Sequence, residues 1–327
     1  MNLDPNEANP PSPTSERIEA LDLSGLAPAR ALDDDEPIAQ EEGFFESFDD
    51  EKLFWQSWEP DEGAERGVVA LMHGFGEHSS RYDHVAGALC RAGYGVMAID
   101  ARGHGRSTGR RAHVAQFGHY VQDLDQLVER TAARWPDLPL FCLGHSNGGL
   151  IALMYALEKP EDLAGFIVTS PMCRLALKVS APKAVTGKVL STVWPTLTMA
   201  NDIDPKKLSH IDRVVEAYER DPLVLKVVSA RWFTEATRAQ DELFERAPQL
   251  NQPFLFLIGG SDQIVDPSAA EEVFHRMTSG DRQMEVYPRL FHEILNERSW
   301  EEVVRRLLDW LEEHRSQAEA KTDEADA

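Results

Sequence analysis

The sequence predicts an α/β fold in which a mostly parallel, doubly wound sheet carries a helical lid inserted between two of its strands. Short apolar runs alternate with segments of helical periodicity over residues 67–170 and again over 253–314. This alternation is typical of a parallel sheet covered by helices on both faces. Residues 171–250 interrupt it with helical periodicity and no convincing strand. Such a sheet presents its functional loops at the carboxyl ends of its strands.

The first 42 residues differ in composition from the rest of the chain. They combine Pro, Ser, Asp and Glu with few aromatic residues, so we expect an acidic, disordered tail. An alternative for "IEALDLSGLAPARAL" is a short amphipathic piece that docks on a partner. Globular patterning begins at Gly43, and we assign residues 43–170 and 251–315 to the core and 316–327 to a second disordered tail.

The predicted elements of the core follow one another in a regular order. Five buried strands are expected from their apolar runs, at residues 67–71, 95–100, 139–143, 165–170 and 253–260, and a further strand at 283–287. Helices are expected from their 3.6-residue periodicity at residues 78–91 (after a loop), 121–135, 150–157, 267–277 and 300–314. An insertion between parallel strands, here residues 171–250, is a natural lid.

Charge and cysteine content exclude some functions and compartments. The net charge of −23 would repel phosphate-rich partners, so we expect no nucleic-acid binding. Cys90, Cys142 and Cys173 lack metal-ligand spacing and are expected to be free thiols of a reducing compartment. The N-terminus lacks the pattern of a signal peptide, and no apolar run reaches the roughly 18 to 20 residues of a membrane span. We therefore expect a cytoplasmic protein.

A serine lies on a glycine-rich corner in "GHSNGG", between a predicted strand and a predicted helix. Gly-x-Ser-x-Gly in this setting is typical of a nucleophile elbow, in which glycines allow a sharp turn that projects the hydroxyl into a pocket. An ordinary glycine turn with a serine N-cap is the alternative for so short a pattern. The rest of the chain must decide between them.

A serine hydroxyl needs a base to remove its proton, and that base is usually an imidazole held by a carboxylate. Asp262 follows the strand at 253–260, and His292 follows the strand at 283–287, which gives the order serine, acid, histidine. Asp266 is the rival acid, but its place before Pro267 favours a helix N-cap. Ser146, Asp262 and His292 are therefore the candidate catalytic residues.

Backbone N–H groups must also hold the oxyanion that forms during acyl transfer. The segment "HGFGEHSSRY" directly follows the first predicted strand, and the N–H of Phe75 in it is one candidate donor. The N–H of Asn147, next to the candidate nucleophile, is the other. A plain glycine turn would explain Gly76 but not the nearby His73, Glu77 and His78.

These motifs identify a resemblance to the serine hydrolases of the α/β-hydrolase superfamily, and within it to the monoacylglycerol lipase and lysophospholipase group. The chain is similar to this group in "HGFGEHSSRY", "DARGHGRSTG", "GHSNGG", "DPLV", "GGSDQIVDP" and "YPRLFHEILNE", in the group's order, from about residue 42 to 314. The resemblance implies Ser146 as nucleophile, Asp262 as acid, His292 as base, and Phe75 and Asn147 as oxyanion donors. Asn147 departs from the methionine of many members, which could alter the pocket floor or the preferred acyl group.

Several other conspicuous residues favour structural roles. Asp100, Arg102, His104 and Ser107 lie in a loop typical of the fold, and His145 inside the elbow is expected to pack against neighbouring strands. "HEILN" begins like a zinc-protease motif but ends in Asn296, so it lacks the second histidine of a metal site. No phosphate loop is present, and neither metal nor cofactor is expected.

The sequence therefore predicts an esterase or lipase that works through an acyl-enzyme. An apolar lid favours a medium or long acyl chain on a small lipid, because burying each CH₂ is worth about 0.8 kcal/mol. The resemblance suggests a monoacylglycerol or lysophospholipid and transient contact of the lid with a membrane surface. The same triad serves thioesterases, peptidases and acyltransferases, and a non-catalytic binding module with an acidic interaction tail is a further alternative. The oligomeric state is left open.

Overall fold

The computed structural model describes residues 18–28, 41–159, 163–176 and 191–325. Within them, eight strands form one sheet in the order β1-β2-β4-β3-β5-β6-β9-β10. The strands are β1 (Glu41–Glu46), β2 (Lys52–Trp58), β3 (Gly67–Met72), β4 (Tyr94–Ile99), β5 (Leu140–His145), β6 (Gly165–Thr169), β9 (Phe254–Gly259) and β10 (Arg282–Tyr287). The pairs β1–β2 and β2–β4 are antiparallel and the other neighbours are parallel. The predicted mostly parallel sheet is confirmed.

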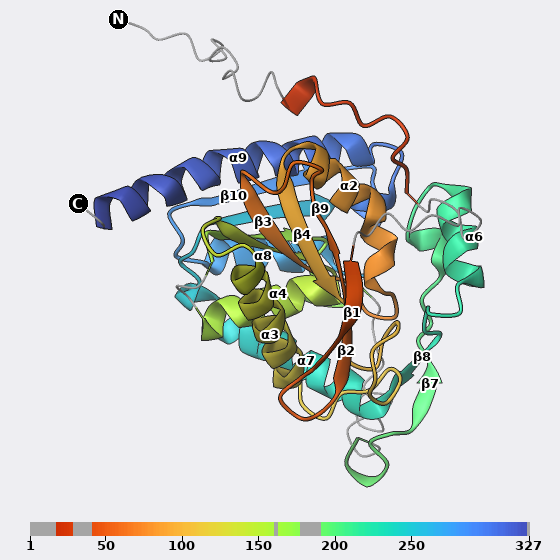
Figure 1. The fold of residues 1–327 in the computed structure, drawn as a ribbon. Coiled ribbons are helices and arrows are strands. Elements are labelled where there is room, and N and C mark those ends of the chain that lie inside the picture. Colours follow the sequence, from red (N-terminus) through yellow and green to blue (C-terminus); the bar gives the residue numbers. More distant parts are fainter. Residues whose placement is uncertain (1–17, 29–40, 160–162, 177–190, 326–327) are drawn as a thin grey trace, which may run out of the picture.

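Helices cover both faces of this sheet (Figure 1). Side chains alternate across a strand, so Val68 and Met72 of β3 belong to one core and Val69 and Leu71 to the other. The first core is completed by α3 (Gly118–Arg134), α4 (Asn147–Glu158), α7 (Ala230–Arg246) and α8 (Pro267–Arg276). The second is completed by α2 (Asp83–Arg91) and α9 (Trp300–Ala325). The sheet is therefore doubly wound, as the sequence predicts.

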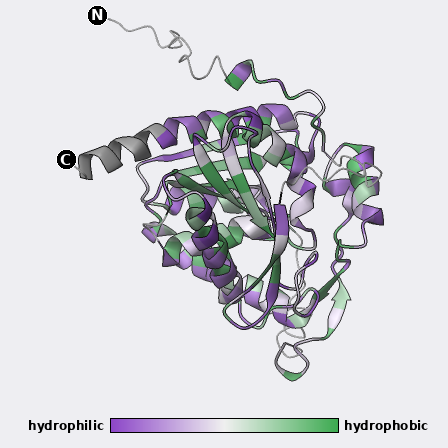
Figure 2. Ribbon diagram, in the orientation of Figure 1, coloured by the Kyte–Doolittle hydropathy of each residue, from purple (hydrophilic) through white to green (hydrophobic). Residues whose placement is uncertain are grey.

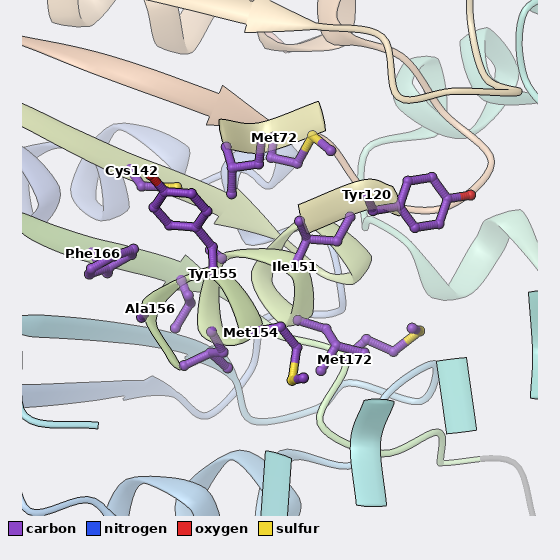
Figure 3. Close-up of a cluster of buried hydrophobic side chains, with 14 of the residues drawn as sticks. Met72, Tyr120, Cys142, Ile151, Met154, Tyr155, Ala156, Phe166 and Met172 are labelled. Atoms are coloured by element: carbon purple, nitrogen blue, oxygen red, sulfur yellow. The ribbon is translucent and has the colours of Figure 1, made fainter. Parts of the chain in front are cut away.

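The first core is densely filled around α4. Figure 3 shows Met72, Cys142 and Phe166 of the strands beside Ile151 and Tyr155 of this helix. In Figure 2 the central strands carry mostly hydrophobic residues, consistent with burial on both faces. A rigid core of this kind holds the strand ends, and the loops that follow them, in fixed positions.

The lid between β6 and β9 is less purely helical than predicted. Its described part contains η2 (Pro205–Lys207), α6 (Asp212–Arg220), α7 and η3 (Ala247–Gln249), but also β7 (Thr198–Ala200) and β8 (Val227–Ser229) in an antiparallel pair. The prediction of no strand here is wrong, because three-residue strands are too short to show an alternating pattern. Helix α7 also packs its buried Trp232 and Leu243 into the first core, so this part of the insertion shares the core of the sheet.

The prediction of a disordered tail over residues 1–42 is wrong for its described parts. Ile18 and Leu23 are buried in the core beneath α2 and α9. Arg91 donates from Nη1 to the Asp22 carbonyl at 2.7 Å, and Arg305 from Nη1 to the Glu19 carbonyl at 2.9 Å. A few apolar side chains among acidic ones were enough to dock residues 18–28 on the chain itself, and residues 41–42 begin β1. Residues 1–17 and 29–40 of the predicted tail lie outside the described residues.

The predicted C-terminal tail is likewise helical over most of its length. Helix α9 continues to Ala325, beyond its predicted end at residue 314. Residues rich in Ala, Glu and Lys extend an existing helix easily, because only the first turn carries the cost of nucleation. Residues 326–327 lie outside the described part. Among the described helices, none combines the length and the apolar composition required to cross a bilayer.

Candidate active site

Ser146 lies on a strained corner between β5 and α4. Its φ of 51° falls in the left-handed region, which is uncommon for a residue other than glycine. The turn is so tight that a Cβ on Gly144 would come within 2.4 Å of the Gly148 carbonyl oxygen. A Cβ on Gly148 would come within 2.1 Å of the Met72 carbonyl oxygen. The glycines of "GHSNGG" are therefore required by space, and the predicted strand–turn–helix setting is present.

The structure brings Ser146, His292 and Asp262 together from three strand ends. His292 Nε2 lies 2.9 Å from Ser146 Oγ, and His292 Nδ1 lies 2.6 Å from Asp262 Oδ2. Asp262 Oδ1 accepts hydrogen bonds from the backbone N–H groups of Ile264 at 2.7 Å and Val265 at 3.0 Å. The carboxylate is thus fixed, and it selects the His292 tautomer that carries its proton on Nδ1 and leaves Nε2 to accept the serine proton.

The electrostatic surroundings suit His292 to act as a base. Burial by itself lowers the pKa of His292, but the carboxylates of Asp262, Glu293 and Glu77 together outweigh burial and raise that pKa above its usual value. The ring of His145 lies 4.9 Å from that of His292 and packs in the elbow, as expected for a structural residue. Burial lowers the pKa of His145 to about 4, which keeps this neighbour neutral at physiological pH.

The rival acid Asp266 has a different partner. Its Oδ1 accepts the backbone N–H of Ser268 at 3.0 Å, and Pro267 occupies the first position of α8. This is the N-cap geometry that the sequence predicts for it. Asp262, and not Asp266, is the carboxylate that bonds His292.

Both candidate oxyanion donors belong to segments that adjoin Ser146. Asn147 is the first residue of α4, and Phe75 lies in the oxyanion loop, which we define as residues 73–78. A Cβ on Gly74 would come within 3.2 Å of Ser146 Cβ, which shows how closely this loop approaches the serine. The Asn147 side chain is buried, and within the described part of the chain its Oδ1 has no hydrogen-bond partner.

His73 fixes the peptide that contains the Phe75 N–H. Its Nε2 accepts the backbone N–H of Ala101 at 2.8 Å, so its proton must lie on Nδ1, which donates to the Gly74 carbonyl at 2.7 Å. Burial lowers the pKa of His73 and keeps the ring neutral. In a planar trans peptide the N–H points away from the C=O, so holding the Gly74 carbonyl also orients the Phe75 N–H.

The loop with Asp100, Arg102, His104 and Ser107 has the structural role expected of it. Asp100 Oδ1 accepts the Ser79 backbone N–H at 2.8 Å, and Arg102 bonds Asp123 through Nε at 2.6 Å. Three charged residues beside the site had no role in the sequence prediction: Glu77, which was noted only as unexplained by a glycine turn, and Arg81 and Glu293, which were not noted at all. The signal for them was present, because two lie within "HGFGEHSSRY" and the third follows His292.

Within the described residues, no group of three His, Cys, Asp or Glu side chains is arranged to hold a metal ion.

Comparisons with known proteins identify the family to which the chain is similar. The Hydrolase_4 family, described as "Serine aminopeptidase, S33", matches residues 63–299. An uncharacterized abhydrolase domain-containing protein of Dictyostelium discoideum is 37% identical over 81% of this chain, which corresponds to only 28% of that relative's length. The monoacylglycerol lipase of Mycolicibacterium smegmatis is 33% identical over 80% of this chain and 94% of the relative.

A solved structure extends the likeness to three dimensions. The crystal structure of Paleococcus ferrophilus monoacylglycerol lipase has a TM-score of 0.74 and 31% sequence identity, and the match covers 80% of this chain and 99% of that one. The family match spans more than half of the chain, and the mycobacterial relative is matched over nearly its full length. The chain therefore belongs to the α/β-hydrolase family of serine hydrolases, as an ester hydrolase that resembles monoacylglycerol lipases.

Proposed function

We propose that the chain hydrolyses esters of single acyl chains, with monoacylglycerols as the leading substrate class, through an acyl-enzyme on Ser146. The observation that carries this proposal is the continuous line of hydrogen bonds from Ser146 Oγ through His292 to Asp262. In the forward step, Ser146 Oγ attacks the carbonyl carbon while His292 Nε2 takes the hydroxyl proton. The N–H groups of Phe75 and Asn147 hold the resulting oxyanion.

The second half of the reaction uses the same groups. The tetrahedral intermediate collapses when the C–O bond to the alcohol breaks and His292 returns its proton to the leaving oxygen. A water molecule, deprotonated by His292, then attacks the acyl carbon, and the proton passes back to Ser146 as the free acid leaves. Asp262 orients the imidazole and stabilises its positive charge in both steps without taking the proton itself.

The preference for a lipid ester rests on the relatives and on the lid. The mycobacterial and archaeal relatives carry the name monoacylglycerol lipase, and buried side chains of the lid, such as Tyr218, Val224 and Trp232, are apolar or aromatic. Each acyl CH₂ that the site removes from water adds about 0.8 kcal/mol to binding. Longer monoacylglycerols should therefore be hydrolysed with higher kcat/KM until the site is filled.

A substrate panel tests this proposal. The purified chain is assayed on monoacylglycerols of increasing chain length, lysophospholipids, an acyl thioester, an aminoacyl amide and a short aryl ester. We expect Ser146-dependent hydrolysis with kcat/KM that rises with chain length and is highest for monoacylglycerols. Higher kcat/KM on the thioester or the amide would transfer the function to a thioesterase or a peptidase. No hydrolysis of any substrate would favour the non-catalytic binding module.

We further propose transient contact with a membrane surface through the lid. Val193, Trp194 and Met199 are 78%, 60% and 47% exposed, and large apolar side chains gathered on one short segment mark interaction sites. Sedimentation with neutral lipid vesicles should be reduced in Trp194→Ser. Equal sedimentation of the variant and the wild type would contradict this contact.

The location and the absence of nucleic-acid partners are also proposed. Cys90, Cys142 and Cys173 are free, two of them buried, as expected in a reducing cytoplasm. The net charge of −23 opposes binding to phosphate-rich polymers. Cell fractionation tests the first point and a gel-shift assay the second, and recovery in the membrane or extracellular fraction would contradict a cytoplasmic location.

A further inference from the structure

A buried arginine lies between two loops of the site and bonds a carboxylate on each. Arg81 Nη1 and Nη2 donate to Oε1 and Oε2 of Glu293, both at 2.7 Å, and Nη1 also bonds Oε2 of Glu77. The side chains of Arg81, Glu77 and Glu293 are only 11%, 4% and 4% exposed. The Arg81 guanidinium also lies 5.1 Å from the ring centroid of Tyr218 in the lid. None of these three charged groups has a role in the proposed acyl transfer.

Glu77 connects the arginine to the oxyanion loop. Its Oε1 accepts the backbone N–H of Gly74 at 2.6 Å and the hydroxyl of Tyr82 at 2.7 Å. Gly74 is the residue whose carbonyl His73 holds and whose peptide carries the Phe75 N–H. The loop segment before the candidate oxyanion donor is therefore held on its N–H side by Glu77 and on its carbonyl side by His73.

Glu293 connects the same arginine to the histidine loop, which we define as residues 288–297. It directly follows His292, and its Oε2 also accepts from Asn296 Nδ2 at 3.0 Å. Its backbone N–H donates to the Leu208 carbonyl of the lid at 2.9 Å. Both oxygens of each carboxylate are thus used, and the guanidinium joins the two loops by bonding a carboxylate on each.

We infer that Arg81 is a positioning residue that locks the oxyanion loop to the histidine loop, so that the oxyanion donor and the base keep one fixed relation to Ser146. This inference rests on the proposed function, because it assigns a role within the same acyl transfer. Arg81 does not touch the reacting atoms. It acts through Glu77 on the Gly74 amide and through Glu293 on the residue next to His292.

The cost of burying these charges argues that the network serves geometry more than stability. Charges that are removed from water lose their hydration, and their mutual attraction does little more than offset this loss. A protein with well-packed apolar residues at the same positions is often equally stable. A planar, bidentate guanidinium does supply fixed directions, which apolar packing lacks. Burial opposes the charge on each partner, but Arg81 holds the pKa of Glu77 at about 2, and Glu293 and Glu77 raise the pKa of Arg81, so both stay ionised.

The network also contributes to the electrostatic environment of His292. The groups facing His292 are Ser146, the Asp262 carboxylate, the neutral ring of His145, and the carboxylates of Glu293 and Glu77. Both glutamates raise the pKa of His292, and the Arg81 cation that bonds the two carboxylates carries the opposite charge. Removing the cation and removing one carboxylate should therefore move the protonation of His292 in opposite directions, which a loss of folding alone would not do.

The test compares Arg81→Met and Glu293→Gln with a matched control, Arg66→Met. Arg66 bonds Glu312 at 2.7 Å, and their side chains are 15% and 7% exposed, so the control breaks a similar ion pair outside the site. Each variant is assayed on a short aryl ester for kcat, KM and the pH profile of kcat/KM, and its thermal unfolding is recorded. A short ester keeps lid binding out of the measurement.

We expect kcat to fall about 10- to 100-fold in both site variants with little change in KM, because small misplacements of catalytic groups have effects of this size. The acid limb of the pH profile should move to higher pH in Arg81→Met and to lower pH in Glu293→Gln. Arg66→Met should keep the wild-type kcat and pH profile. Shifts in the same direction, a raised KM with unchanged kcat, or a kcat no lower than that of the control would overturn the inference.

Two further measurements keep the test decisive. If Arg81→Met does not fold, Glu293→Gln decides alone, because glutamine has the shape of glutamate, and an unmoved acid limb with unchanged kcat would overturn the inference. Ser146→Ala separates this inference from the proposed function. Full activity of Ser146→Ala would refute the acyl-enzyme proposal, whereas Ser146-dependent activity that is insensitive to Arg81 would refute the positioning role alone.

Discussion

The edge of the sheet at which the parallel strands end, and the lid, hold their side chains in different ways. At the edge, Ser146, Asp262 and His292 are joined by hydrogen bonds of 2.6 to 2.9 Å, and the backbone fixes the carboxylate from behind. The described lid packs apolar side chains such as Val224 against the core and bonds the body of the fold through pairs such as His78 and Asp221 at 2.8 Å, but it leaves Val193 and Trp194 largely exposed. A directional site loses its function with a small displacement, whereas an apolar surface changes its affinity gradually. We therefore expect substitutions at the edge to change the chemical step and substitutions in the lid to change the choice of substrate.

Asp262→Asn should have the largest effect on kcat, and it should distinguish Asp262 from its neighbour Asp266. It should lower kcat by about 10⁴-fold, because asparagine cannot keep the His292 tautomer that accepts the serine proton. Asp266→Asn is the matched control four residues further on, where asparagine caps α8 about as well as aspartate does. Steady-state kinetics on a short aryl ester measure both variants. The opposite ranking would make Asp266 the acid.

A smaller and more selective effect is expected in the lid. Ile203 and Val228 are half-buried lid residues that pack against the first core. Truncating both to alanine should raise KM for a long-chain monoacylglycerol several-fold and leave the short aryl ester nearly unchanged, because only the long chain loses buried area, at about 0.8 kcal/mol per CH₂. Kinetics on both substrates, with thermal unfolding as the check of folding, give the answer. An equal loss on both substrates would mean that the lid does not select the acyl chain.

The smallest expected effect is on the free energy of unfolding in acid. It should depend on a histidine buried in the body of the fold and not on one in the lid. Burial lowers the pKa of His84, on α2, to about 4, from an ordinary value of 6.5, whereas His210 of the lid is 41% exposed. The unfolded chain therefore binds a proton at this residue below pH 6.5 that the folded chain refuses until about pH 4. Stability should fall as the pH drops through this window, by at most about 1.4 kcal/mol per pH unit for each such histidine.

Chemical denaturation at pH 7 and pH 5 measures this dependence. The free energy of unfolding should be lower at pH 5, and His84→Gln should reduce the difference, since glutamine does not titrate. His210→Gln, which removes a lid histidine bonded to Glu297 at 2.7 Å, should not reduce the difference. A larger effect of His210→Gln than of His84→Gln would place the acid-sensitive groups in the lid.

Much of the fold could be predicted because its central strands are buried on both faces. The strands β3, β4, β5, β6 and β9 are continuous apolar runs, which the sequence shows directly. The hairpin of β1 and β2 was missed because its burial is mixed and polar residues interrupt it. The docking of residues 18–28 was missed for a different reason. Its partners on α2 and α9 are distant in the chain, and the three buried residues of the segment, Ile18, Leu23 and Pro28, are not conspicuous in an acidic composition.

The site shows the same division between local and distant signals. Ser146, Asp262 and His292 could be predicted because each follows a strand in a fixed order along the chain. The bond between Arg81 and Glu293 spans 212 residues and depends on two loops meeting at the sheet edge, so no local pattern contains it. The β7–β8 pair of the lid is likewise a tertiary feature, since three residues per strand leave no periodicity to detect.

The most direct test of the central claim is to identify the residue that an active-site probe modifies. A fluorophosphonate reacts with a serine that a neighbouring base activates, and peptide mass spectrometry locates the adduct. We expect one adduct, on Ser146, formed far more slowly in Asp262→Asn and absent from Ser146→Ala, which should retain the wild-type fold. An adduct on another residue, or equal labelling of Ser146→Ala, would contradict it.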